Sequence, residues 1–377
     1  MSGLAHELHE PAHADAPTVP ALVHDYLLVM RGAERTFAAI ADCWPTAEIF
    51  TLLHDPAGID NRFSTRHVST SALQRLGLRQ DGFRRLLPLF PAAVERLPVA
   101  GHGLVISSSS AFAHGVQTGD GAIHVSYCHS PFRYAWHERT SALAETPRLL
   151  RPVVGRVLDR IRRWDLQASR RVTHYIANSE ITRERIQRFW GRGASIVYPP
   201  VDVDRFAIGV PEDFFLVVSA LVAHKRVDVA LEAARRARVR VKVVGAGPEL
   251  PRLRRVYGSH AEFLGRLSDR ELAGLYSRTR ALIVPNIEEF GIAAVEAQSA
   301  GRPVVAAEGG GARETVAEGE TGVFVPAGDV GALAEALAET DFERFSPIAS
   351  RDHAARFSTR SFQRTFVGEV SRIAGEA

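Results

Sequence analysis

The most constraining feature of this sequence is a short apolar run that ends at a proline and is followed by an acidic loop and a helix. The run at 283–285 is typical of a buried strand that stops at the proline. The residues at 293–300 are good helix formers, and a glycine and a proline follow them. Glu288 and Glu289 therefore lie on the loop after the strand, whereas Glu296 lies within the helix.

A second unit of the same kind follows directly. The apolar residues at 303–307 predict another strand, and the glycines at 309–311 with Glu314 form the loop after it. Ligands of open α/β sheets bind at the carboxyl ends of the strands, where both loops lie. Free backbone N–H groups at 290–292, at the start of the first helix, would suit an anion. A glutamate near a helix start can also serve only the helix dipole, so the acidic residues alone leave the function open.

The length and composition fit a two-domain protein with a sizeable core. The chain has 377 residues, of which 46% are hydrophobic. Its formal net charge of +3 argues against a general nucleic-acid binder. The two cysteines, Cys43 and Cys128, are far apart, which predicts buried thiols rather than a disulfide or a zinc site. The sequence has no long apolar run and no signal-peptide pattern, so a cytoplasmic protein is expected.

Alternating strands and helices run through both halves of the chain. In the first half, one strand leads to a loop with Gly32, and a later strand ends at His129. Two prolines after a strand at 195–198 mark a hinge. A second series starts at 214, and its first loop carries Lys225 at the start of a helix, where it can offer charge to a diphosphate. The pattern predicts an α/β fold.

These motifs together resemble family 4 of the retaining GT-B glycosyltransferases (GT4). The family pattern E-x-F-G-x-x-x-x-E-A stands here as Glu288, Phe290, Gly291, Glu296 and Ala297. The resemblance implies that Glu288 contacts hydroxyls of the donor sugar and that Glu296 contacts the ribose of the nucleotide. It also implies that the backbone amides between them touch the diphosphate.

Further loops carry the same resemblance on the donor side. Gly32 lies in a match to the family's G-G-x-E-R loop, with Arg31 in place of the first glycine, and Leu267 lies where the family's backbone meets the nucleobase. One departure is clear, because Ala220 stands five residues before Lys225, where the family usually has an arginine. This puts the strength of diphosphate binding in doubt. The donor-binding residues that the resemblance implies are Gly32, Lys225, Arg226, Leu267, Glu288, Phe290, Gly291, Ile292 and Glu296.

The loop after His129 resembles the C-H-x-P-x-R-Y loop of a GT4 subgroup that acts on cell-surface polysaccharide and O-antigen intermediates. The resemblance implies that His129 lies beside the donor sugar, near the reacting carbon. The implied catalytic residues are His129, Glu288 and Lys225. Arg133, Tyr134 and Trp136 become candidates for acceptor contacts, and packing is the other reading of all three.

The resemblance also implies a fold and a domain plan. The fold is GT-B, with two Rossmann-like parallel-sheet domains facing a central cleft and a C-terminal helix that crosses back to the N-terminal domain. The plan is a disordered tail at 1–18, an acceptor-binding domain at 19–204, a nucleotide-sugar-binding domain at 205–345 and a returning helical segment at 346–377. No metal or other cofactor is expected, because helix N-termini and cations would neutralise the donor diphosphate.

The predicted function is retaining transfer of a hexose from a nucleoside diphosphate sugar, with GDP-mannose favoured. The acceptor would be polyprenyl-diphosphate-linked or a glycan, in cell-surface polysaccharide synthesis, with no nucleic-acid partner. Two arginine-rich stretches, at 75–96 and 148–171, lie in the acceptor half and favour peripheral binding to an anionic membrane surface at the inner face of the cell membrane. Ordinary solvated helices are the other reading of these arginines.

Two other functions are compatible with the same fold. One is a catalytically weak GT-B subunit that binds a nucleotide sugar or a partner enzyme, which Ala220 would support. The other is a nucleotide-sugar 2-epimerase. The presence of His129, Lys225, Glu288 and Glu296 counts against the subunit, and the loop at 128–131 with the spacing of Glu288 favours transfer over epimerisation.

Overall fold

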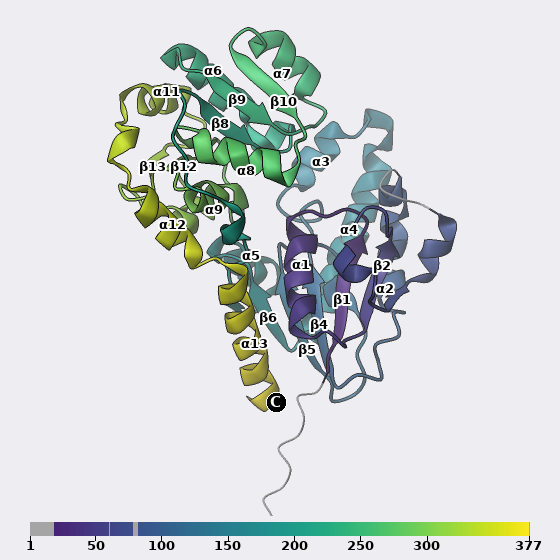
Figure 1. Ribbon diagram of the computed structural model, residues 1–377. Coiled ribbons are helices and arrows are strands. Elements are labelled where there is room, and N and C mark those ends of the chain that lie inside the picture. Colours follow the sequence, from purple (N-terminus) through teal and green to yellow (C-terminus); the bar gives the residue numbers. More distant parts are fainter. Residues whose placement is uncertain (1–18, 60, 78–81, 377) are drawn as a thin grey trace, which may run out of the picture.

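The computed structural model describes residues 19–59, 61–77 and 82–376 and contains two parallel β-sheets, each flanked by helices (Figure 1). The tail predicted at 1–18 lies outside the described residues. The two sheets confirm the predicted pair of Rossmann-like domains. In both sheets the strand order reverses beside the first strand, and this is the point where open α/β sheets bind their ligands.

The first sheet has seven strands in the order β3-β2-β1-β4-β5-β6-β7. Parallel strands are covered on both faces and need continuous apolar runs, and six of the seven residues of β1 are buried accordingly. The strands are β1 (Ala21–Leu27), β2 (Ile49–His54), β3 (Val68–Thr70), β4 (Leu104–Ser109), β5 (Ile123–Cys128), β6 (His174–Ala177) and β7 (Ala194–Ile196).

The helices of this domain connect successive strands. The main ones are α1 (Gly32–Cys43), α2 (Phe90–Val94), α3 (Arg139–Glu145), α4 (Arg151–Ala168) and α5 (Glu180–Trp190). Before α2 and α4 the chain forms two 3-10 segments, η3 (Phe83–Leu89) and η5 (Arg148–Leu150). The arginine-rich stretch at 148–171 is therefore mainly one long helix, whereas the described part of the stretch at 75–96 combines 3-10 turns with the short helix α2.

The second sheet has six strands in the order β10-β9-β8-β11-β12-β13. The strand predicted at 283–285 is β11, and the helix predicted at 293–300 is α9, with small shifts at the ends. The strands are β8 (Phe215–Val218), β9 (Val241–Val244), β10 (Ala261–Gly265), β11 (Leu282–Val284), β12 (Val304–Ala307) and β13 (Gly322–Val325). The helices are α6 (Val227–Ala237), α7 (Leu250–Tyr257), α8 (Asp269–Arg278), α9 (Ile292–Ser299), α10 (Ala312–Thr315) and α11 (Val330–Glu339).

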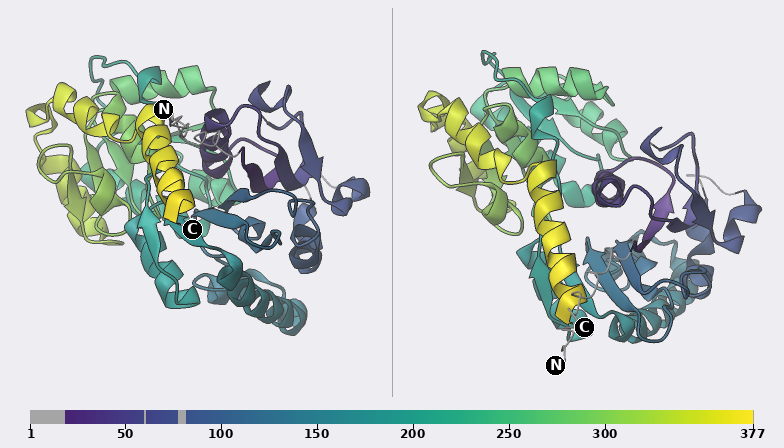
Figure 2. Two further views of the ribbon diagram at one scale, coloured as in Figure 1. Left: turned by 90° about the horizontal axis from the view of Figure 1, so that it is seen from below. Right: turned by 60° about the horizontal axis from the view of Figure 1, so that its bottom comes forward.

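The end of the chain returns to the first domain, as predicted. Helix α12 (Pro347–Ala355) packs on α9 of the second domain, and α13 (Thr359–Glu376) then runs along the first domain beside α1 (Figures 1 and 2). The helical spacing of Phe362, Phe366, Val370 and Ile373 gives α13 one apolar face, and this face is buried in the core between α1 and the first sheet. Burial of these four side chains ties the end of the chain to the N-terminal domain.

Candidate functional site

The carboxyl ends of the two sets of strands supply the predicted site residues. Gly32 begins α1 after β1, and His129 directly follows β5. Lys225 ends the short turn η8 (Ala223–Lys225) after β8, and Glu288 lies between β11 and α9. A cavity of about 430 Å³ lies between the domains, and residues from both of them line it, including Arg35 of α1 and Glu296 of α9.

Glu288 is held by two side chains of its own domain. The Lys225 ammonium donates to Glu288 Oε2 at 2.5 Å, and Asn286 Nδ2 donates to Glu288 Oε1 at 3.1 Å. Both Lys225 and Glu288 keep about a fifth of their side chains exposed, so the pair faces a pocket rather than the core. The structure thus brings together two of the three predicted catalytic residues. Sequence reasoning missed Asn286, although a polar residue directly after Pro285 at a strand end was a visible signal.

The start of α9 is shaped by glycine. Gly291, the residue before the helix, has a φ of 93°, a conformation that residues with a side chain rarely adopt. The glycine run after β12 packs behind the same loop, because a Cβ on Gly311 would lie 2.2 Å from Phe290 Cα. Across the cavity, a Cβ on Gly32 would lie 3.2 Å from Ile292 Cδ1. The backbone of the first domain therefore approaches the N-terminus of α9 closely enough to confine a ligand there.

The Glu296 side chain is mostly shielded from solvent, and each of its two carboxylate oxygens accepts a hydrogen bond. Arg205 donates to Glu296 Oε1 and the Tyr276 hydroxyl donates to Oε2, both at 2.9 Å. Burial raises the pKa of Glu296, and the charge of Arg205 opposes this shift. Arg205 also contacts Asp269 at 2.7 Å and so closes a small ion network beside the interdomain cavity. Arg205 and Tyr276 carried no signal in the sequence, since only the fold brings them to Glu296.

His129 is held as a neutral imidazole at the end of β5. Its Nε2 lies 2.9 Å from Ser108 Oγ, and its carbonyl oxygen accepts a hydrogen bond from Thr182 Oγ1 at 3.2 Å. Burial lowers the pKa of His129 to about 4, so the ring carries no charge near neutral pH. A neutral ring can offer either a donor or an acceptor to a sugar hydroxyl without attracting a counter-ion.

The three acceptor candidates divide between the cleft and the core. Arg133 lies 3.5 Å from Glu138 and 3.9 Å from Glu289, a residue of the opposite domain. Trp136 stacks on Phe189 and donates to Asp165 at 2.6 Å, and the Tyr134 ring packs edge-on to Phe132. The contacts of Trp136 and Tyr134 fit the packing reading, whereas Arg133 faces the second domain.

Two predicted donor residues lie at the margin of the site. Arg226 has a φ of 48° and lies 3.8 Å from Asp228, and its side chain is half exposed. Leu267 follows β10 and packs partly on the core of the second domain. Within the described residues, no group of three or more His, Cys, Asp or Glu side chains could hold a metal ion.

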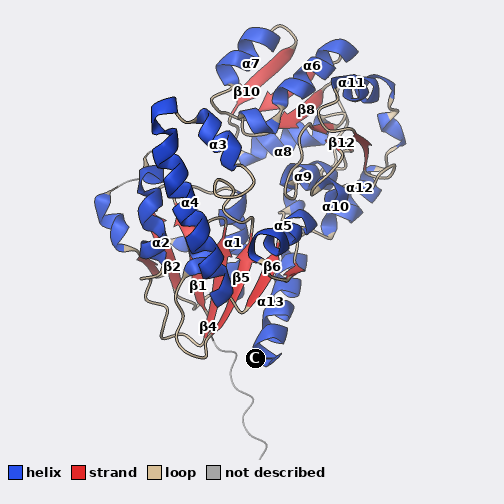
Figure 3. Ribbon diagram, turned by 180° about the vertical axis from the view of Figure 1, so that it is seen from behind, coloured by secondary structure: helices blue, strands red, loops and turns tan. Residues whose placement is uncertain are grey.

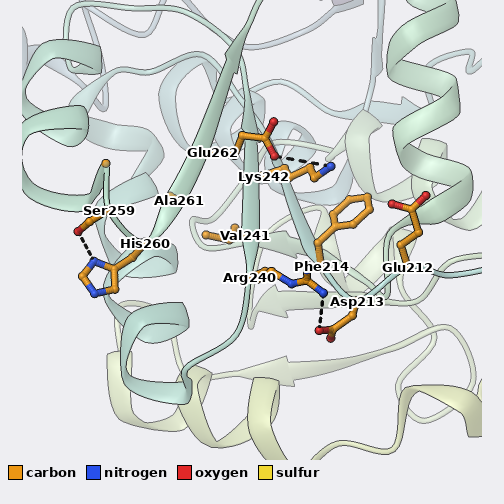
Figure 4. Close-up of a pocket in the computed structure, with 11 residues that line it drawn as sticks. Glu212, Asp213, Phe214, Arg240, Val241, Lys242, Ser259, His260, Ala261 and Glu262 are labelled. Carbon is orange, nitrogen blue, oxygen red and sulfur yellow. Dashed lines mark hydrogen bonds and ion pairs between the residues drawn. The ribbon is translucent and has the colours of Figure 1, made fainter.

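A larger cavity of about 830 Å³ lies at the opposite, amino-terminal ends of β8, β9 and β10 (Figure 4). Its charged side chains pair with one another, as Arg240 with Asp213 at 2.9 Å and Lys242 with Glu262 at 3.6 Å. These pairs neutralise each other, and the cavity is at the edge of the sheet away from the predicted site residues.

Residues 202–340 match the family model described as "Glycosyl transferases group 1". This segment is therefore similar to that glycosyltransferase family. The match covers the second domain and contains Lys225, Glu288 and Glu296.

Curated relatives extend the comparison to about half of the chain. The D-inositol 3-phosphate glycosyltransferase of Mycolicibacterium smegmatis is 32% identical over 212 residues, which cover 48% of this chain and 49% of the relative. The GDP-mannose-dependent alpha-(1-6)-phosphatidylinositol monomannoside mannosyltransferase of Mycobacterium tuberculosis is 31% identical over 205 residues, or 45% of this chain and 53% of the relative. The chain thus spans about half the length of the curated relatives that it matches.

Solved structures of glycosyltransferases share the fold of the whole chain. The Anabaena protein HepE, solved in complex with UDP and glucose, is 18% identical with a TM-score of 0.68, over 94% of this chain and 99% of that one. Sucrose-phosphate synthase from Thermosynechococcus elongatus is also 18% identical, with a TM-score of 0.69 over 95% and 100%. These neighbours confirm the predicted GT-B fold.

Proposed function

We propose that this protein is a retaining hexosyltransferase that uses a nucleoside diphosphate sugar, with GDP-mannose favoured. The observation that carries the proposal is the paired Lys225 and Glu288 beside the N-terminus of α9, inside a segment that matches a glycosyltransferase family. A relative whose name gives GDP-mannose dependence supports the choice of donor.

Each side chain has a distinct part in the proposed reaction. Lys225 and the free N–H groups at the start of α9 stabilise the charge that develops on the leaving diphosphate. Glu288 accepts hydrogen bonds from sugar hydroxyls and fixes the sugar in the pocket. His129 contacts the same sugar from the first domain. The acceptor hydroxyl attacks the anomeric carbon on the face that the diphosphate leaves, and a departing phosphate oxygen takes up its proton, so the configuration is retained.

The proposed acceptor is a polyprenyl-diphosphate-linked sugar or a glycan, met at the inner face of a membrane. Both arginine-rich stretches border one groove of about 380 Å³ between α2 and α4, which is lined by Pro88, Arg156, Arg160 and Trp164 among others. Leu89 and Val153 are about half exposed near this groove, and Leu149 is almost fully exposed. Apolar side chains among arginines suit an anionic bilayer surface. No helix among the described residues is long and apolar enough to span a membrane.

A panel of nucleotide sugars tests the proposal. GDP-, UDP- and ADP-linked hexoses are added separately, and thermal stability, turnover and the anomeric configuration of the product are measured. A ligand at one hundred times its dissociation constant should add about 2.7 kcal/mol of stability. Stabilisation by one base, with transfer that retains configuration, is the expected result. Inversion of configuration would contradict the mechanism, and no stabilisation by any nucleotide sugar would contradict the function.

A binding subunit without transfer is the second candidate. The observation that favours it is Ala220, which is exposed and brings no cation to the loop before η8. The same panel separates the two, because this candidate predicts stabilisation by a nucleotide sugar with no turnover for any acceptor offered.

A further inference from the structure

Helix α5 belongs to the first domain, yet two carboxylates of the second domain hold it. Glu314 of α10 accepts hydrogen bonds from the Glu180 backbone N–H with both oxygens, at 2.9 and 3.0 Å. Further along α5, Arg185 donates to Glu289 Oε1 at 3.0 Å. Figure 3 shows α5 on the side of the first sheet that lies nearest to α9 and α10. These contacts make α5 a bridge between the domains.

The ion pair between Glu289 and Arg185 is partly shielded from solvent. The Glu289 and Arg185 side chains are 22% and 19% exposed, so solvent screens their attraction less than it would on the surface. Arg133 and His137, from the loop after His129, also approach the same Glu289 oxygen, at 3.9 and 4.0 Å. Burial alone would raise the pKa of Glu289, but Arg133 and Arg185 together hold it below its ordinary value. The carboxylate therefore stays ionised between its partners.

The same helix holds one of the predicted catalytic residues. Thr182, one turn before Arg185, donates to the His129 carbonyl oxygen at 3.2 Å. On the other side of the cleft, Glu289 is the chain neighbour of Glu288. A continuous path thus runs from Glu288 through Glu289, Arg185 and Thr182 to His129.

We propose that Glu289 and Arg185 are positioning residues that fix His129 of one domain relative to Glu288 of the other. This inference rests on the proposed function, because it needs both residues to act on one sugar. Apart from Gly32, the implied donor-binding residues belong to the second domain, so loss of the ion pair should largely spare donor binding and impair the reaction. Small displacements of reacting groups are costly, with a shift of about 1 Å costing about 10²-fold in rate.

The test compares Glu289→Gln, Arg185→Gln and the double variant with a matched control, Arg183→Gln. Arg183 lies on the same helix and pairs with Glu180 within α5. We expect kcat to fall about tenfold or more in each single variant, with the KM for the donor within about twofold. Because the two residues act through each other, the double variant should be no slower than the singles. The control should retain the full rate.

Hydrogen exchange gives a readout that needs no turnover. In Glu289→Gln and Arg185→Gln, amides at 129–137 and 180–185 should exchange faster than in the unchanged protein and in Arg183→Gln. Unchanged exchange, or additive losses in the double variant, would overturn the inference. If the protein proves to bind no nucleotide sugar, the proposed function fails, whereas normal transfer by Glu289→Gln defeats the positioning role alone.

Discussion

At the scale of single residues, Glu288 is the side chain whose removal should separate binding from transfer. Glu288→Ala removes the acceptor of the Lys225 and Asn286 bonds and leaves the start of α9 intact. We expect the rate of transfer to fall by about 10²- to 10³-fold, because a preorganised polar contact to the reacting sugar is lost. Nucleotide affinity, measured by calorimetry, should change little. Glu308→Ala, on the loop after β12, is the control, and full transfer by Glu288→Ala would refute the role.

Replacement of Glu296 should weaken nucleotide binding itself rather than only the rate of transfer. Glu296→Gln keeps the shape of the side chain but removes the charge that Arg205 and Tyr276 now hold in place. Since hydrogen bonds to a charged group are worth about 1.5–3 kcal/mol, affinity for the free nucleotide should fall by about tenfold or more. Tyr276→Phe, which leaves the carboxylate in place, should have a smaller effect. An unchanged affinity in Glu296→Gln would show that this carboxylate does not contact the ribose.

The sequence predicts where a site residue lies when the residues around it define the local strand, loop and helix. The strand, loop and helix around Glu288 follow from apolar runs, a proline and a glycine, so this loop was placed correctly. For Arg226 the sequence did not indicate the left-handed backbone or the approach to Asp228, and its donor role stays a prediction. Arg205 could not be assigned to Glu296 at all, since 91 residues separate them and only the packing of η7 (Val203–Arg205) against α9 joins them.

At the scale of elements, strands were easier to predict than the segment before α2. Continuous apolar runs mark buried parallel strands, and β11 and β12 follow this rule. A pair of ordinary helices was one reading of the stretch at 75–96, but Gly77 and Gly82 have positive φ and Pro88 lies inside η3. These residues break a regular helix into 3-10 turns. Arginines and leucines still reach the surface there, so the membrane prediction survives the change of element.

The groove between α2 and α4 supports a prediction about vesicles. Arg156→Glu with Arg160→Glu should weaken binding to anionic vesicles by about 30-fold or more, since each arginine near a charged leaflet contributes about 1 kcal/mol and each new glutamate is repelled by it. Co-sedimentation measures this, and binding should also fall as salt rises. The matched control is Arg252→Glu with Arg255→Glu, two exposed residues of α7 in the other domain. Equal binding to neutral and anionic vesicles would leave the groove without a membrane role.

At the scale of the whole molecule, the first domain contains several buried or half-buried side chains whose pKa values burial shifts strongly. Burial lowers the pKa to about 3 or 4 for five of its histidines, His24, His114, His124, His129 and His137. Burial also raises the pKa of three carboxyl groups, to about 7 for Glu34 and Asp165, and in the same direction for Asp25. When the domain unfolds, the histidines take up protons and the carboxyl groups release them.

The balance predicts that the first domain loses stability as the pH falls. A histidine kept neutral in the folded state takes up a proton on unfolding below its ordinary pKa of 6.5, so it favours the unfolded state there. The three carboxyl groups release protons on unfolding and favour the folded state. The histidines with a lowered pKa outnumber the carboxyl groups with a raised one, so unfolding takes up protons on balance, and the stability of the domain should fall as the pH falls from about 6 toward about 4.

Tryptophan fluorescence can follow the acid-induced unfolding of the first domain alone. All four tryptophans, Trp44, Trp136, Trp164 and Trp190, precede the second sheet, and two of them pack on His114. On acidification, fluorescence should report unfolding at a higher pH than the final loss of helical circular dichroism, because helices α6 to α11 contribute to the dichroism while all the tryptophans lie in the first domain. The control is His260→Asn in the second domain, which should not move the fluorescence midpoint. Coincident transitions would mean that the interdomain contacts at α5 couple the domains into one unfolding unit, and a midpoint that does not depend on pH would contradict the histidine argument.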